Sequence, residues 1–283
     1  MCIVRTNVPA CKLKADILRN FASDELLTQL DFPTAAIPFV RMKTIQEDAV
    51  IGRFDLVKTP SGFKILELNA DTPTFIKECF RVNGLLCREF GLEDANEGEE
   101  ERLRSAIRNA LVETAMHMNL SQPNIVFTSH DDHEEDLLTT LYLLEISGIK
   151  AKYVPLQSLA IDDEGLYDDG GEQIDILYRQ TYPMEHLVCD EDEQGINVWE
   201  KLVQLVMAGK LSLVNPPSAF LLQSKALQAI IWGLMEEDSE FLRRVRKTGS
   251  AQPFCQPILK KTSLLRVING LSKNLHSAGK AIP

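Results

Sequence analysis

The chain has 283 residues, 45% of them hydrophobic and 25% charged, which is typical of a globular protein large enough for more than one domain. Its net charge of −11 argues against a nucleic-acid partner, because such proteins bind phosphates with an excess of Lys and Arg. No apolar run approaches the roughly 20 residues of a membrane span, and the first residues lack the apolar segment of a signal peptide. Six scattered cysteines without a CxxC pair indicate reduced thiols, so we expect a cytoplasmic protein without a membrane partner.

The charge is distributed unevenly along the chain. Residues 241–283 contain nine Lys or Arg and no Asp or Glu. Because the whole chain has 30 basic and 41 acidic residues, the first 240 residues hold 21 and 41. Either a basic arm folds back on an acidic body, or this tail has a different origin from the rest.

The first part of the chain predicts short helices followed by a pair of strands. Residues 14–31 suit short surface helices, which Pro33 and Pro38 end. Segments 52–58 and 62–70 alternate polar and apolar side chains, as half-buried strands do.

Thr72 and Pro73 then predict a helix start, with a hydroxyl at the N-cap and proline at the first helical position. A second helix is expected to end near Leu120. From about residue 121 to 215, short apolar runs alternate with helical segments, which predicts a parallel βαβ layer. The expected strands are 124–129, 151–156, 171–180 and 210–217. Residues from Ser218 onward read as helical, and the chain has neither a GxxxxGK loop nor a GxGxxG motif.

The turn between the two alternating strands sets their register. Pro60 and Gly62 predict a three-residue hairpin loop with a bulge, in which Thr59 faces Phe63. Opposing residue numbers would then sum to 122 along the hairpin.

That register places Asp55 opposite Glu67 and Arg53 opposite Asn69, with all four side chains on one face. The other face would pack into a core. Its expected members are Phe54, Leu56, Leu66 and Leu68.

Two directly opposed carboxylates repel each other unless a cation lies between them. Asp55, Glu67 and a neighbouring amide suit Mg²⁺, and Arg53 could neutralise a phosphoryl group beside it. Thr72 and Thr74 would lie at a helix N-terminus, where free N–H groups favour an anion. A solvated ribbon would show the same alternation, although it would rather pair Glu with Lys.

Three sequence blocks resemble the glutathionylspermidine synthase family of ATP-grasp amide ligases. The first is "GRFDLV" with "KILELNADTPT", which is similar to the family's metal-and-substrate hairpin. The others are "DDHEED", and "DILYRQTYPMEHL" followed by "LVNPPSAFLLQSKAL". They stand in the family's order between about residues 40 and 240.

The resemblance implies an α/β fold: a permuted ATP-grasp into which a βαβ substrate domain is inserted. Residues 1–120 would form the N-terminal ATP-grasp portion with the metal-binding hairpin. Residues 121–215 would form the substrate domain, and residues 216–283 the start of the nucleotide lobe with the basic tail.

The resemblance also implies roles for individual residues. Asp55, Glu67 and Asn69 resemble the magnesium ligands, and Arg53 resembles the arginine that contacts the transferred phosphate. Arg53, Asp55 and Lys225 are the implied ATP contacts. The implied substrate-binding positions are Thr72, Thr74, Glu134 and Glu135.

The implied reaction transfers the γ-phosphoryl group of ATP to a carboxylate, and an amine attacks the resulting acyl phosphate. The implied substrates are a glutathione-like peptide or another carboxylate, together with an amine. After Glu240, however, neither "ILKKTS" nor "SAGKAI" reproduces the family's phosphate-covering "K-P-x-x-R-E-G" loop. A shifted reading frame would explain both this departure and the basic tail. We therefore expect little or no ATP turnover, and the alternative is a non-catalytic remnant that binds Mg²⁺ or a peptide.

His130 and His133 lie among acidic residues between an expected strand and an expected helix. They could suggest a metal site. An N-cap with an acidic first turn is the more common explanation of such a pattern.

Overall fold

The computed structural model describes residues 2–4, 19–20, 22–60, 62–181, 184–192 and 195–225. The basic tail 241–283 and most of the helix expected after Ser218 lie outside these residues. In the described ranges, no helix combines the length and the apolar character that crossing a membrane requires.

A four-stranded parallel sheet forms the larger layer, in the order β5-β4-β8-β9. Its strands are β5 (Lys152–Tyr153), β4 (Ile125–Ser129), β8 (Ile176–Gln180) and β9 (Ser212–Val214). Every residue of β4, β8 and β9 is buried, so these strands do not alternate between buried and exposed positions as the hairpin strands do. The sheet confirms the expected mixed α/β fold with a parallel βαβ layer.

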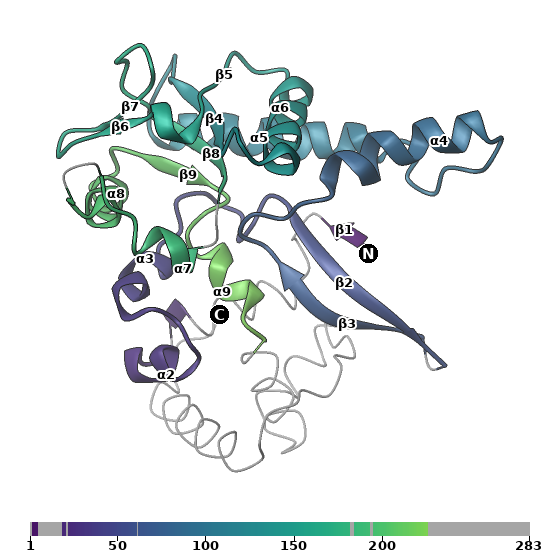
Figure 1. The fold of residues 1–283 in the computed structure, drawn as a ribbon, viewed down its shortest axis with the longest axis horizontal. Coiled ribbons are helices and arrows are strands. Elements are labelled where there is room, and N and C mark those ends of the chain that lie inside the picture. Colours follow the sequence, from purple (N-terminus) through teal and green to yellow (C-terminus); the bar gives the residue numbers. More distant parts are fainter. Residues whose placement is uncertain are drawn as a thin grey trace.

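Helices cover both faces of this sheet (Figure 1). On one face, α5 (Glu99–His117) and α6 (Glu134–Ser147) pack over a core that includes Phe127 and Tyr178, whose rings stack with centroids 4.9 Å apart. On the other face lies α8 (Val198–Met207), together with helices from the first forty residues. These are α2 (Asp24–Gln29), η1 (Thr34–Ala36) and α3 (Ile37–Val40).

Short elements fill the connections of the parallel layer. They are η3 (Leu156–Ser158), β6 (Ala160–Ile161), β7 (Leu166–Tyr167) and α7 (Met184–Leu187).

A smaller antiparallel sheet lies beside the parallel layer, in the order β1-β2-β3 (Figure 1). It comprises β1 (Cys2–Val4), β2 (Gly52–Thr59) and β3 (Gly62–Asn69). Near its base, Arg53 pairs with Asn69 and Asp55 with Glu67, which confirms the expected register.

The tip of the hairpin differs from the expectation. Thr59 pairs with Gly62, not with Phe63, so the loop is one residue shorter than predicted. The extra residue of β3 is instead accommodated inside the strand, where Asp55 pairs with Glu67 but Leu56 pairs with Ile65. Leu66 is therefore the bulged residue.

This bulge changes which side chains reach the core. Phe54 and Leu68 are buried as expected, and they pack with α9 (Ala219–Gln223). Leu66 was expected to join them but is 47% exposed, and Ile65 packs against the core in its place. A one-residue shift moves every side chain beyond it to the other face, which explains the exchange.

The chain after β3 also departs from the expected helix start. Thr72 and Pro73 are not helical, and Phe75 has a φ of 68°, so helical structure begins only at residue 76. The helix continues as the π-helical turn η2 (Glu78–Val82) and α4 (Asn83–Glu89), which form an arm at the side of the molecule (Figure 1). The N-terminal anion site expected at Thr72 and Thr74 is therefore not formed by this helix.

Candidate functional site

The polar face of the hairpin brings a basic and two acidic side chains together. Arg53 donates from Nε to Asp55 Oδ1 over 3.1 Å and lies on the same face, because the two residues are two positions apart on β2. Asp55 in turn faces Glu67 across the strands. The side chains of Arg53, Asp55 and Glu67 are 18%, 31% and 30% exposed, so the face is open to solvent but not fully hydrated.

Arg53 also connects the hairpin to the segment that follows β3. Its Nη1 donates to Thr74 Oγ1 over 3.1 Å. The two predicted residues are thus in direct contact, although Thr74 lies in an extended segment and not at a helix N-terminus.

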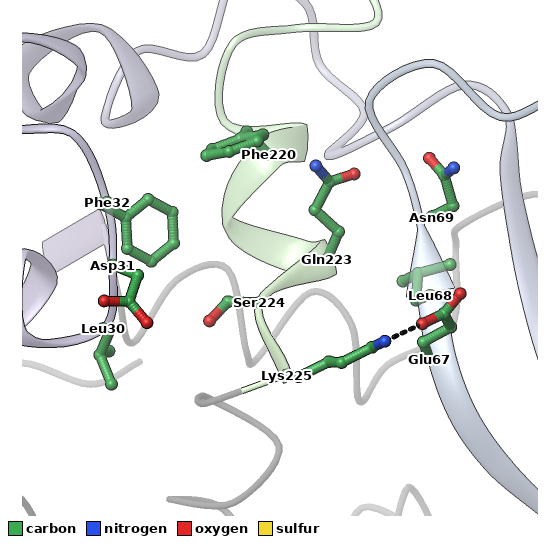
Figure 2. A pocket seen from close by; sticks show the side chains of 10 residues that line it. All are labelled: Leu30, Asp31, Phe32, Glu67, Leu68, Asn69, Phe220, Gln223, Ser224 and Lys225. Atoms are coloured by element: carbon green, nitrogen blue, oxygen red, sulfur yellow. Dashed lines mark ion pairs between the residues drawn. The ribbon is translucent and has the colours of Figure 1, made fainter. Parts of the chain in front are cut away.

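A pocket of about 380 Å³ opens between β3, α9 and the turn after α2. Figure 2 shows Glu67 and Asn69 of β3 on one side, and Gln223 and Lys225 on the other. Lys225 Nζ lies 2.5 Å from Glu67 Oε2, which places the predicted ATP-contacting lysine beside a predicted metal ligand. The remaining lining residues are Leu30, Asp31, Phe32, Leu68, Phe220 and Ser224.

The donor set of this face matches the chemistry of a hard divalent cation. It consists of two carboxylates and the amide of Asn69, and oxygen atoms of these types are the ligands that Mg²⁺ takes. Each carboxylate is paired with its own cation, Asp55 with Arg53 and Glu67 with Lys225. Among the described residues, no cluster of three or more His, Cys, Asp or Glu side chains is arranged to hold a metal.

A second group of polar residues lies at the carboxyl ends of β4 and β8. In the sheet, β5 lies on one side of β4 and β8 lies on the other side of β4. The strand order therefore reverses between β4 and β8. Ligands of open α/β sheets bind in the crevice at such a point.

The loop after β4 leads into the N-terminus of α6. The side chain of His133 caps this helix by accepting from the N–H of Asp136 over 3.4 Å. The N-cap interpretation of His133 is therefore confirmed. Glu134 and Glu135 occupy the first turn and are exposed, on an element that packs against the parallel sheet.

The acidic side chain of α6 that points inward is Asp136. It is 8% exposed, and burial raises its pKa above the ordinary value, although nearby His133 and a hydrogen bond from Gln180 oppose the shift. Asp136 follows directly after Glu134 and Glu135, and nothing in the sequence indicated which of the three carboxylates would be buried.

Two residues of β8 hold the segment after β3, and both escaped the sequence interpretation. Gln180 Nε2 donates to the carbonyl oxygens of Thr72 and Pro73 over 3.1 and 3.2 Å. Arg179 forms a buried ion pair with Asp71. The alternation of the hairpin sequence continues through Asp71, and this was the only sign of its importance.

A comparison with protein-family models finds a match over most of the chain. The model described as "Glutathionylspermidine synthase preATP-grasp" matches residues 10–268. The matched range covers the parallel sheet and strands β2 and β3 of the smaller sheet, and it also includes the first part of the basic tail that begins at residue 241. Because the match extends over most of the sequence, the chain belongs to the glutathionylspermidine synthase family.

Proposed function

We propose that this chain has the active-site architecture of an ATP- and Mg²⁺-dependent carboxylate–amine ligase that acts through an acyl phosphate. Family membership supports ligase chemistry in general. The observation that carries the finer proposal is the register of the hairpin, which sets Asp55 against Glu67 and Arg53 against Asn69 on one open face.

Asp55, Glu67 and Asn69 would hold the Mg²⁺ ion, which neutralises charge on the phosphate oxygens when it is bound. Arg53 is fixed by Asp55 and Thr74, so its guanidinium is oriented before any ligand binds. A guanidinium held in this way can bind a phosphate through two parallel hydrogen bonds. Phosphoryl transfer depends mainly on such positioning and charge neutralisation.

Lys225 would contact the ATP phosphates from the pocket between β3 and α9. Its side chain is 73% exposed while it pairs with Glu67, so it can exchange this partner for a phosphate at small cost. The nucleotide would then lie on the same side of the hairpin as the metal ligands.

The carboxylate and amine substrates would approach from the crevice at the ends of β4 and β8. Thr72 and Thr74 lie on the hairpin side of this region, and α6 supplies Glu134 and Glu135 from the other side. Within the proposed permuted ATP-grasp, residues 121–215 are the substrate domain, and 1–120 and 216–283 belong to the ATP-grasp portion. We propose a cytoplasmic enzyme whose substrates are a glutathione-like peptide or another carboxylate, together with an amine.

A second candidate is a non-catalytic remnant that binds Mg²⁺ or a peptide without turnover. The change of composition at residue 241 favours it.

The two candidates are separated by measuring phosphate release with MgATP, glutathione and spermidine. The ligase predicts slow release that requires both substrates and is lost in Asp55→Asn. Binding of Mg²⁺ or glutathione without substrate-dependent release would support the remnant and overturn the ligase. Release that persists in Asp55→Asn would show that the hairpin is not the site.

A further inference from the structure

An ion pair between Asp71 and Arg179 joins the two sheets. Asp71 follows β3, Arg179 lies in β8, and their side chains are only 1% and 4% exposed. Arg179 Nη2 donates to Asp71 Oδ1, and Arg179 Nη1 donates to Thr181 Oγ1 over 3.1 Å.

Stability alone does not explain a buried pair of this kind. Removing two charges from water costs much of what their attraction returns, and apolar residues of similar volume are often as stable. The Oδ2 atom of Asp71 is also buried without a hydrogen-bond partner among the residues that the structure describes. Burying this pair therefore costs free energy that apolar side chains would not cost. We infer from this that the pair fixes the position of the chain segments that it joins.

The chain segment whose position is at issue runs from Ala70 to Thr74. Asn215 Nδ2 donates to the carbonyl oxygens of Ala70 and Asp71 over 3.0 and 3.1 Å, and Gln223 Oε1 accepts from the N–H of Asp71 over 3.3 Å. These bonds fix where the segment leaves β3.

The direction of the segment toward β8 depends on the next contacts along the chain. Gln180 holds the carbonyl oxygens of Thr72 and Pro73, and Arg53 holds the hydroxyl of Thr74. Arg179, the neighbour of Gln180, provides the charged anchor of the same end of β8.

We propose that Asp71 and Arg179 are positioning residues, which hold the Thr72–Thr74 segment at a fixed distance between the metal-binding hairpin and the carboxyl end of β8. This inference rests on the proposed function. The pair would align a substrate bound at Thr72 and Thr74 with the phosphate bound at Arg53. It would therefore affect peptide binding and turnover without affecting metal binding.

The first test is hydrogen exchange of the full chain, followed by mass spectrometry, in Asp71→Asn and Arg179→Lys. Exchange in residues 70–76 should become about tenfold faster in both variants, while exchange in β4 is unchanged. Asp168→Asn is the matched control. Asp168 is a buried carboxylate paired with Lys152 at 2.5 Å, but it lies near the amino end of β4, where Asn124 contacts it. This control should leave exchange in 70–76 at the wild-type rate.

The second test compares two ligands by calorimetry. Mn²⁺, as a probe of the hairpin, should bind Asp71→Asn as it binds the wild type, whereas the affinity for glutathione should fall about tenfold. The double variant Asp71→Glu with Arg179→Lys lengthens one side chain and shortens the other, so it should recover glutathione binding relative to Arg179→Lys alone.

Three results would overturn the proposal: unchanged exchange in 70–76, an equal increase throughout the chain, or no recovery in the double variant. If the wild type binds neither Mn²⁺ nor glutathione, the proposed function fails. The exchange comparison still decides whether the pair fixes the segment.

Discussion

Asp55 on β2 lies directly opposite Glu67 on β3, and each of the two carboxylates is paired with a basic side chain. Arg53 comes from the same strand as Asp55, whereas Lys225 reaches Glu67 from beyond α9. Opposed carboxylates repel each other, so these cations relieve a cost that the register imposes. A divalent ion bound here has to compete with both of them.

Asp55→Asn should weaken divalent-cation binding at least about tenfold, because it removes one of two ligand charges. Titration calorimetry with Mn²⁺ measures the effect. Glu101→Gln provides a control, since Glu101 is an exposed carboxylate of α5 that pairs with Arg104. Equal losses in the two variants would show that binding is not local to the hairpin.

Lys225→Met should change the affinities for Mg²⁺ and for MgATP in opposite directions. Loss of the lysine leaves Glu67 without its cation, so the affinity for Mg²⁺ alone should rise roughly threefold, as expected for an exposed ion pair. The affinity for MgATP should fall roughly tenfold, because a charged phosphate contact is lost. A decrease in both affinities would contradict the assigned role of this lysine.

Ile65→Ala should destabilise the protein more than Leu66→Ala, although simple alternation predicts the reverse. Ile65 packs against the core and should contribute about 1–2 kcal/mol to the free energy of unfolding, whereas the exposed Leu66 should contribute within about 0.5 kcal/mol. Urea unfolding of the two variants measures this difference. The opposite order would place the bulge elsewhere on β3.

Asp168 should make stability depend on pH in the acid range. Burial alone would raise its pKa, but hydrogen bonds from Lys152, Asn124 and two backbone N–H groups lower its pKa to about 2. This pKa lies below the roughly 3.9 of an aspartate in the unfolded chain. Ionised Asp168 therefore stabilises the fold fully at pH values above about 3.9, and this stabilisation is lost as the pH falls toward 2.

Urea midpoints of the wild type and of Asp168→Asn, measured between pH 6 and pH 2, test this assignment. The difference between the two proteins should shrink across the lower half of that range. A difference that stays constant would mean that another group causes the acid sensitivity.

Asp136 should have the opposite effect on the pH dependence of stability. Burial raises its pKa, so the native protein retains a proton that the unfolded chain releases, and stability falls as the pH rises above roughly 3.9 toward the native value. Asp136→Asn should therefore raise the melting temperature at pH 7 but not at pH 3. The exposed Asp132, replaced by Asn, serves as a control from the loop that precedes α6. A lower melting temperature for Asp136→Asn at pH 7 would show that the ionised carboxylate stabilises the fold.

The sequence predicted the base of the hairpin because its polar and apolar residues alternate without interruption from Arg53 to Asp55 and from Glu67 to Asn69. The bulge at Leu66 could not be predicted, since Ile65 and Leu66 are both aliphatic and either could face the core. Which of them does so depends on α9, which lies far along the chain.

The start of the helix after β3 illustrates a second limit. Thr72 and Pro73 are a favourable N-cap pair, but the carbonyl oxygens of both bind Gln180, a residue more than 100 positions away. Tertiary contacts of this kind override local preference. The N-cap at His133 was predictable because its hydrogen bond is formed three residues away, within the helix itself.

Asn215 has a consequence for how the molecule can move. Its side chain forms five hydrogen bonds with backbone groups just before β2 and just after β3, at Val50, Ile51, Ala70 and Asp71. Because Asn215 directly follows β9, these hydrogen bonds connect the base of the hairpin to the parallel sheet. The base and the sheet should therefore open only together, as one cooperative unit. Bending is left to the outer half of the hairpin beyond Leu66.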